Sequence, residues 1–123
     1  MYERILVGTD GSKTAAKAVD RAVQVAATAG AALTIFSAAP TAKGEAVVAA
    51  EAARHEGSGV DITTKVVDTA PVAGLIEEAR SGGFDLLVMG NKGMTGVTRF
   101  LKGSVPNKVS HHLPCSLLIV KTT

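Results

Sequence analysis

Short apolar runs alternate along the chain with longer segments in which apolar residues return every three or four positions. The runs have the length of buried strands, and the periodic segments have the spacing of one helix face. Strands that alternate with helices favour an α/β domain with a mostly parallel sheet and right-handed crossovers. The sequence therefore predicts five strands, at Ile5–Val7, Leu33–Ala38, Ile62–Val67, Leu86–Met89 and Leu117–Val120.

The clearest helical segment runs from Ser12 to Ala29. Ser12 is a suitable N-cap, and Gly30 suits the left-handed residue that often follows a helix. The third strand mixes polar and apolar residues, which favours an edge position in the sheet. About four helices are expected in all, the other three at Glu45–His55, from Pro71 through Ala79, and from about Ser104 to His112.

The segment between the fourth strand and the last helix has the features of a phosphate-binding loop. It reads Gly90-Asn91-Lys92-Gly93, then nine residues, then Gly103-Ser104. Glycine lets backbone N–H groups approach an anion closely, and a helix start adds unpaired donors and a positive dipole end. The same loop contains no acidic residue and carries three cations, Lys92, Arg99 and Lys102.

This glycine spacing resembles the nucleotide-binding signature of the universal stress protein family. Ile5–Ser12 resembles that family's first strand and its Asp-bearing turn, and Cys115–Val120 resembles its last strand. The resemblance covers essentially the whole chain. It implies a three-layer Rossmann-like sandwich of the adenine nucleotide alpha hydrolase type, with strand order 3-2-1-4-5. It also implies an adenine nucleotide as ligand, ATP with Mg²⁺ or alternatively cyclic AMP, and a homodimer through Ser116–Lys121.

In that strand order the first and fourth strands are neighbours, and the direction of winding reverses between them. Ligands of open α/β sheets bind beyond the carboxyl ends of the strands at such a point. Together with the resemblance, this places the nucleoside near Asp10 and the backbone of Ala38, and the phosphates on the glycine loop as far as Val105, because Pro106 has no N–H. The expected site residues are Gly8, Thr9, Asp10, Ala38, Met89, Gly90, Lys92, Gly93, Gly103, Ser104 and Val105.

Some of the residues with candidate chemistry also have a purely structural interpretation. Asp10 can form an Asx-turn, in which its side chain bonds the backbone two residues further on. Ser104 can be a helix cap, which is compatible with binding phosphate. His111, His112 and Cys115 look like metal ligands on paper, but adjacent histidines point about 100° apart on a helix. A role at the negative end of the helix dipole is the better interpretation for these histidines.

Composition narrows the class of protein. The chain has 123 residues, 46% of them hydrophobic, which suits one domain over residues 1–123. Its net charge of +2 is far from the clustered basic surface that binds nucleic acid. The single cysteine, the absence of a signal peptide and the lack of a bilayer-spanning apolar run lead us to expect a cytoplasmic protein without membrane contacts.

The candidate chemistry favours binding over catalysis. Phosphoryl transfer needs a positioned base or water-orienting group, and Asp85 precedes the fourth strand, at the wrong edge of the sheet. The first hypothesis is therefore a nucleotide-binding regulatory module of the stress response. The alternatives are a slow ATP hydrolase and a dimeric interaction module with an unused pocket, and the intact signature counts against the last.

Overall fold

A computed structural model describes residues 1–91, 113 and 115–122. It contains one five-stranded parallel sheet in the order β3-β2-β1-β4-β5, which confirms the expected fold class. The expected helix at Ser104–His112 lies outside the described residues. The described elements are β1 (Arg4–Gly8), α1 (Lys13–Ala29), β2 (Ala32–Ala38), α2 (Thr41–Arg54), β3 (Ile62–Val67), α3 (Pro71–Ser81), β4 (Leu86–Gly90) and β5 (Ser116–Val120).

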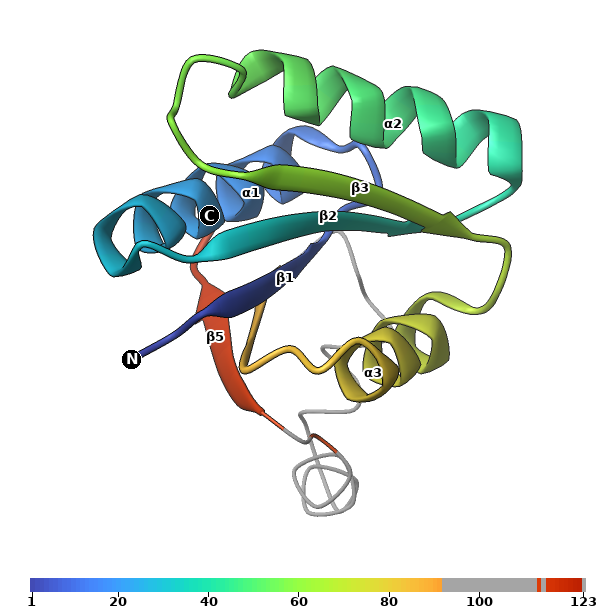
Figure 1. The fold of residues 1–123 in the computed structure, drawn as a ribbon. Helices are drawn as coiled ribbons and strands as arrows, with labels where there is room; N and C mark the ends of the chain where they lie inside the picture. The colour runs from blue at the N-terminus through green and yellow to red at the C-terminus, as the bar shows by residue number, and fades with distance from the viewer. Residues whose placement is uncertain (92–112, 114, 123) are drawn as a thin grey trace.

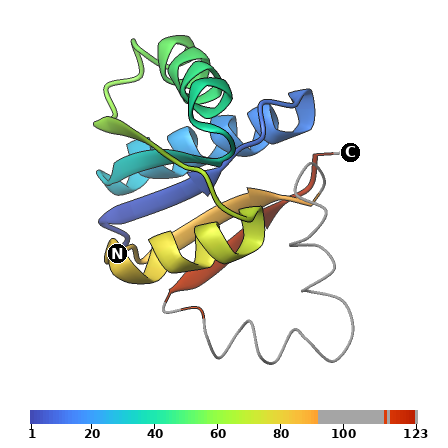
Figure 2. The same ribbon diagram turned by 90° about the vertical axis from the view of Figure 1, so that its right-hand side faces the viewer.

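Helices cover both faces of the sheet. α1 and α2 lie on one face, and α3 lies on the other (Figures 1 and 2). β3 is an edge strand, as its mixed polarity predicts, and β5 forms the opposite edge. In the described part of the chain, no helix combines the length and the apolar character needed to cross a bilayer.

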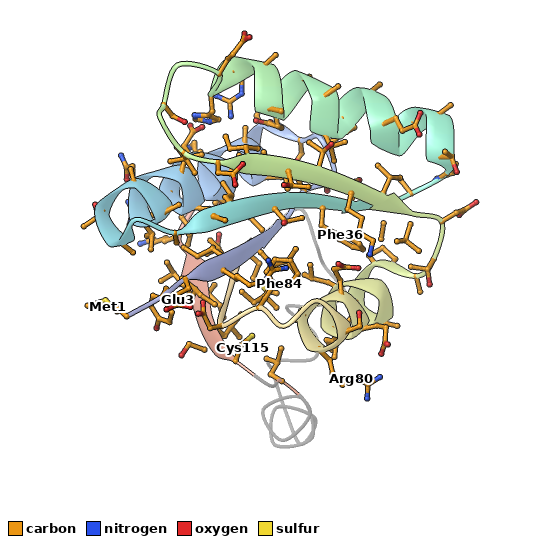
Figure 3. All side chains as sticks on the ribbon, in the orientation of Figure 1. Met1, Glu3, Phe36, Arg80, Phe84 and Cys115 are labelled. Carbon is orange, nitrogen blue, oxygen red and sulfur yellow. The ribbon has the colours of Figure 1, made fainter. Side chains whose placement is uncertain are left out.

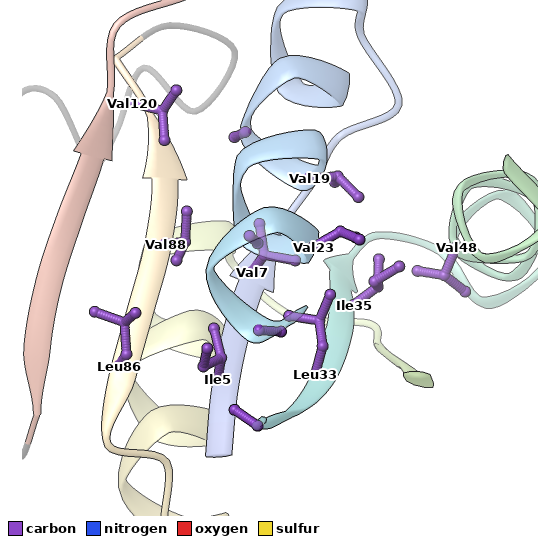
Figure 4. Packing of buried hydrophobic residues seen from close by; sticks show 14 residues of the cluster. Ile5, Val7, Val19, Val23, Leu33, Ile35, Val48, Leu86, Val88 and Val120 are labelled. Carbon is purple, nitrogen blue, oxygen red and sulfur yellow. The ribbon is translucent and has the colours of Figure 1, made fainter. Parts of the chain in front are cut away.

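The larger core fills the space between the sheet and α1 (Figure 4). Alternate residues of a strand point to opposite faces, and Ile5, Val7 and Val88 point toward this helix. The inner face of α1 carries small residues, which let the helix lie close to the sheet. The buried residues of α1 are Ala15, Ala18, Val19, Ala22, Val23 and Ala26.

A second core lies on the α3 side of the sheet and contains the bulkier side chains. Phe36 of β2 and Phe84 lie on this side (Figure 3), with Leu6 from β1 and Leu87 from β4. Leu6 and Leu87 are fully buried, as are their strand neighbours on the other face. β1 and β4 are therefore apolar on both faces, which is typical of central parallel strands.

The boundaries of α1 follow the predicted caps. The Ser12 hydroxyl accepts a hydrogen bond of 3.1 Å from the backbone N–H of Ala15. Gly30 adopts the left-handed conformation at φ +67°, and its N–H donates to the carbonyl of Ala26. A residue with a Cβ would be strained at that φ, so the glycine allows the helix to stop there and the chain to enter β2.

α2 begins earlier than its sequence predicts, at Thr41 rather than Glu45. Gly44 lies just before the expected start, and glycine is locally unfavourable in a helix interior. In the structure Gly44 is inside the helix and buried against β3, where a Cβ would come within 2.4 Å of a Val66 methyl group. Close packing of α2 on β3 thus overrides the local preference.

Cys115 lies just before β5, half-buried on the α3 side of the sheet (Figure 3). Burial raises the pKa of its thiol above the ordinary value, and the negative charge of Asp85 raises it further. A backbone hydrogen bond with Leu87 acts in the opposite direction without reversing the shift. The thiol is therefore held in its protonated, poorly nucleophilic form at neutral pH.

Replacing the cap of α1 tests its contribution to stability. Ser12→Ala removes the acceptor for the Ala15 N–H and should lower the free energy of unfolding by about 1 kcal/mol. Ser12→Asn keeps a capping oxygen and should stay close to wild type. Urea denaturation of both variants without ligand measures the difference, and equal losses would show that the hydroxyl does not act as a cap.

The state of Cys115 can be tested by alkylation. Because its pKa is raised, iodoacetamide should react more slowly at pH 7 with the folded chain than with the chain unfolded in urea. The rate for the folded chain should rise with pH at a higher midpoint than for the unfolded chain. Coincident pH profiles of the two states would contradict the raised pKa.

Candidate functional site

The carboxyl ends of β1 and β4 meet at the centre of the sheet. Val7 pairs with Val88, so Thr9 and Gly90 lie at the same level just beyond the paired strands. β2 lies on the other side of β1, whereas the chain continues from β4 to β5, so the winding reverses between β1 and β4. The structure thus brings the Asp10 turn and the first residue of the glycine motif to the same edge, where α/β sheets bind ligands.

The turn after β1 is tightly hydrogen-bonded. Asp10 Oδ1 accepts from the Ser12 N–H at 2.9 Å, which is the Asx-turn that the sequence offers as one interpretation. Thr9 is buried, and its hydroxyl accepts from the N–H of Gly11. Asp10 remains exposed, and among the described residues its second carboxylate oxygen has no partner. The turn therefore fixes Asp10 while leaving an acceptor directed to the surroundings.

Gly11 is the residue that allows this turn to lie under α2. Its φ is +84°, and a Cβ there would approach a methyl group of Val47 within 2.9 Å. A larger residue would thus be strained in the backbone and would also clash with α2. The close approach of Gly11 to Val47 places the N-terminal half of α2 directly behind the Asp10 turn.

Ala38 presents its backbone toward the same region. Residues along a parallel strand direct their backbone groups to alternate sides. Phe36 accepts from the N–H of Thr9 on the β1 side, whereas the N–H of Ala39 donates to Val67 of β3. Ala38 consequently faces the β1 side, two residues beyond the last pair of β1 and β2. Its N–H and C=O are therefore directed to the β1 side of β2, beyond the end of β1.

The last two residues of β4 have different roles: the Met89 side chain belongs to the core, and Gly90 begins the glycine motif. Met89 is buried in the α3-side core, so only its backbone is available to a ligand. Gly90 is buried and pairs with Val120 of β5. The remaining expected site residues lie outside the described part of the chain; they are Lys92, Gly93, Gly103, Ser104 and Val105.

A hydrogen-bonded cluster that the sequence did not reveal holds the residue after β4. Asn91 Oδ1 accepts from both the N–H and the hydroxyl of Thr122, at 3.0 and 2.8 Å. The Asn91 N–H donates to the carbonyl of Val120. Asn91 and Thr122 are 31 positions apart. The only sequence signal is that Asn91 directly follows β4 and Thr122 lies two residues beyond β5, the strand that pairs with β4.

Asp85 lies at the opposite edge and has a structural role there. Its two carboxylate oxygens accept from the N–H groups of Glu3 and Arg4, at 2.9 and 3.2 Å. The carboxylate therefore ties the start of β1 to the start of β4. Among the described residues, no three His, Cys, Asp or Glu side chains gather as metal ligands would. His111 and His112 lie outside those residues.

Comparison with known proteins agrees with this architecture. The model of the Universal stress protein family matches residues 1–53 and 37–121. Universal stress protein Rv1636 of Mycobacterium tuberculosis H37Rv is 34% identical over 99% of this chain and 98% of its own. Universal stress protein MJ0531 of Methanocaldococcus jannaschii is 30% identical over 98% of this chain and 83% of its own.

A solved structure extends the agreement to three dimensions. A universal stress protein crystallised in complex with cAMP is 40% identical to this chain, with a TM-score of 0.81. The match covers 99% of this chain and 98% of the solved one. The family model and these relatives cover nearly the whole chain, and the chain belongs to the universal stress protein family.

Proposed function

We propose that this protein binds an adenine nucleotide at the carboxyl edge of β1, β2 and β4. The observation that carries the proposal is the meeting of Asp10, the Ala38 backbone and Gly90 at the point where the winding of the sheet reverses. The Ala38 N–H and C=O offer one donor and one acceptor to the edge of a base. The second oxygen of Asp10 offers an acceptor to ribose hydroxyls or to an exocyclic amine.

The phosphate end of the ligand is assigned to the glycine motif that begins at Gly90. The loop supplies the backbone of Gly93 and Gly103, the hydroxyl and N–H of Ser104, and the N–H of Val105. Backbone N–H groups at glycines suit an anion because no side chain keeps the phosphate away from them. Lys92 adds a positive charge of the required sign.

ATP is the ligand that we propose first, and cyclic AMP is the alternative. The alternative is supported by the 40% identical universal stress protein that was crystallised with cAMP. Any Mg²⁺ is proposed to accompany the triphosphate of ATP. Asp85, at the opposite edge, is unsuited to act on the phosphates, which favours a regulatory binding module over a hydrolase.

We also propose a homodimer formed by β5. The two edges of the sheet differ in character: β3 carries Lys65, which pairs with Glu78 of α3, whereas Leu117–Val120 is apolar throughout. Ile119 of β5 is 43% exposed. A charged edge resists pairing with another strand and an apolar edge invites it. Two-fold pairing of β5 with β5 would cover this side chain in both copies.

The glycine motif can be tested with a substitution and a matched control. Gly103→Val should weaken ATP binding by roughly tenfold to a hundredfold, because a side chain there keeps backbone donors away from the phosphates. Gly57→Val changes an exposed loop glycine whose Cβ would meet open space, and it should bind as wild type. Calorimetric titration with ATP measures both variants, and equal affinities would remove the motif from the site.

The identity of the ligand requires a separate measurement. Mass spectrometry of small molecules released from the denatured, freshly purified wild-type protein should detect an adenine nucleotide. Competition between ATP and cyclic AMP then decides between the two ligands. A wild-type protein that neither carries nor binds either compound would refute the proposed function.

The dimer proposal predicts a difference between the two edges of the sheet. Ile119→Lys places a charge on the β5 edge and should shift the protein from dimer to monomer at micromolar concentration. Val67→Lys makes the same change at an exposed position of the β3 edge and should leave the dimer intact. Analytical ultracentrifugation distinguishes the outcomes, and a monomeric wild type would exclude the dimer.

A further inference from the structure

Thr122 lies two residues beyond β5, and all of its polar groups are hydrogen-bonded within the described structure. Its N–H and hydroxyl both donate to Asn91 Oδ1. Its carbonyl accepts from Lys17 Nζ of α1 at 3.0 Å. The residue is only 3% exposed. This arrangement connects three elements, because Asn91 follows β4, Thr122 follows β5, and Lys17 belongs to α1.

The position of Asn91 gives this cluster its significance. Asn91 is the second residue of the glycine motif and the last described residue before position 92. The Val120 carbonyl holds its backbone N–H, and Thr122 holds its side chain from the same side. Among the described contacts, β5 and the residues that follow it thus hold both the backbone and the side chain of the first residue after β4.

The nucleoside side of the edge is held by different contacts. Asp10 is fixed by the N–H of Ser12, and Ala38 lies in the pairing between β2 and β3. Within the described part of the chain, the hydrogen bonds of Thr122 go to Asn91 and Lys17 and reach neither Asp10 nor Ala38. A change at Thr122 should therefore act on one end of the site and leave the other end in place.

We propose that Thr122 is a positioning residue for the phosphate end of the nucleotide site, acting through Asn91. This inference rests on the proposed function. By holding Asn91 in place before the ligand arrives, Thr122 lowers the entropic cost of fixing this residue on binding. The expected signature is a loss of affinity that depends on the phosphates of the ligand and not on its base and sugar.

Thr122→Val tests this because it keeps the size and branching of the side chain and removes only the hydroxyl. We expect ATP affinity to fall by roughly threefold to tenfold, the usual effect of one lost hydrogen bond. Adenosine affinity should stay unchanged. Both are measured by displacement of a fluorescent ATP analogue, and thermal unfolding without ligand confirms that the variant is folded.

Three further variants make the result specific. Thr122→Ser retains the hydroxyl and should restore the wild-type ratio of ATP to adenosine affinity. Thr64→Val makes the same change at an exposed position of β3 and should have no effect. Lys17→Met removes the bond to the Thr122 carbonyl from the α1 side, so it should lower ATP affinity selectively even if Thr122→Val does not fold.

The outcomes separate this inference from the function on which it rests. If the wild-type protein binds ATP but Thr122→Val weakens ATP and adenosine equally, or neither, then Thr122 has only a structural role. The same conclusion follows if Thr122→Val does not fold and Lys17→Met leaves the ratio unchanged. If the wild type binds no adenine nucleotide, the proposed function fails first and this inference fails with it.

Discussion

The pairing of β1 with β4 is the constraint on which the rest of the structure depends. Both strands are apolar on both faces, with Leu6 and Leu87 buried against α3 and with Val7 and Val88 buried against α1. Such strands are stable only at the centre of a sheet that is covered by helices on each side. Once they are adjacent, the chain has to extend the sheet outward in both directions. The reversal of winding, and with it the candidate site, follows from this burial.

The amino and carboxyl ends of the strands then have different roles. The amino edge is closed by structural contacts: Asp85 holds the start of β1, and the Arg4 guanidinium donates to the Gly82 carbonyl and lies 4.9 Å from the centre of the Phe84 ring. At the carboxyl edge, the turns expose a carboxylate and backbone groups instead. A rigid edge on one side allows polar groups to be held in fixed positions on the other, which is what a binding site requires.

The sequence predicts those features that depend on neighbouring residues. The strands are correctly placed to within a residue or two, and the Ser12 and Gly30 caps are confirmed, because apolar runs and cap residues act locally. The predicted start of α2 was wrong. Gly44 lies inside this helix because only a residue without a Cβ fits against Val66, and no local pattern reveals that contact. The bonds of Asn91 to Thr122 join residues that only the order of the strands brings together. For the candidate site, the sequence locates Asp10, Ala38 and Gly90 at one edge but cannot show that the Met89 side chain is buried in the α3-side core.

β5 links the two proposals made for this protein. One side of the strand pairs with β4 and, through Val120 and Thr122, holds the first residue after β4. The other side is the apolar edge proposed to pair with a second copy. Pairing across that edge would restrict the motion of β5, and the order gained there would extend to Thr122 and Asn91. Nucleotide binding and dimerisation would then stabilise the same segment, and thermodynamic linkage requires each to favour the other by the same free energy. The path for such coupling is a single strand, because β5 lies between β4 and the apolar edge of the sheet.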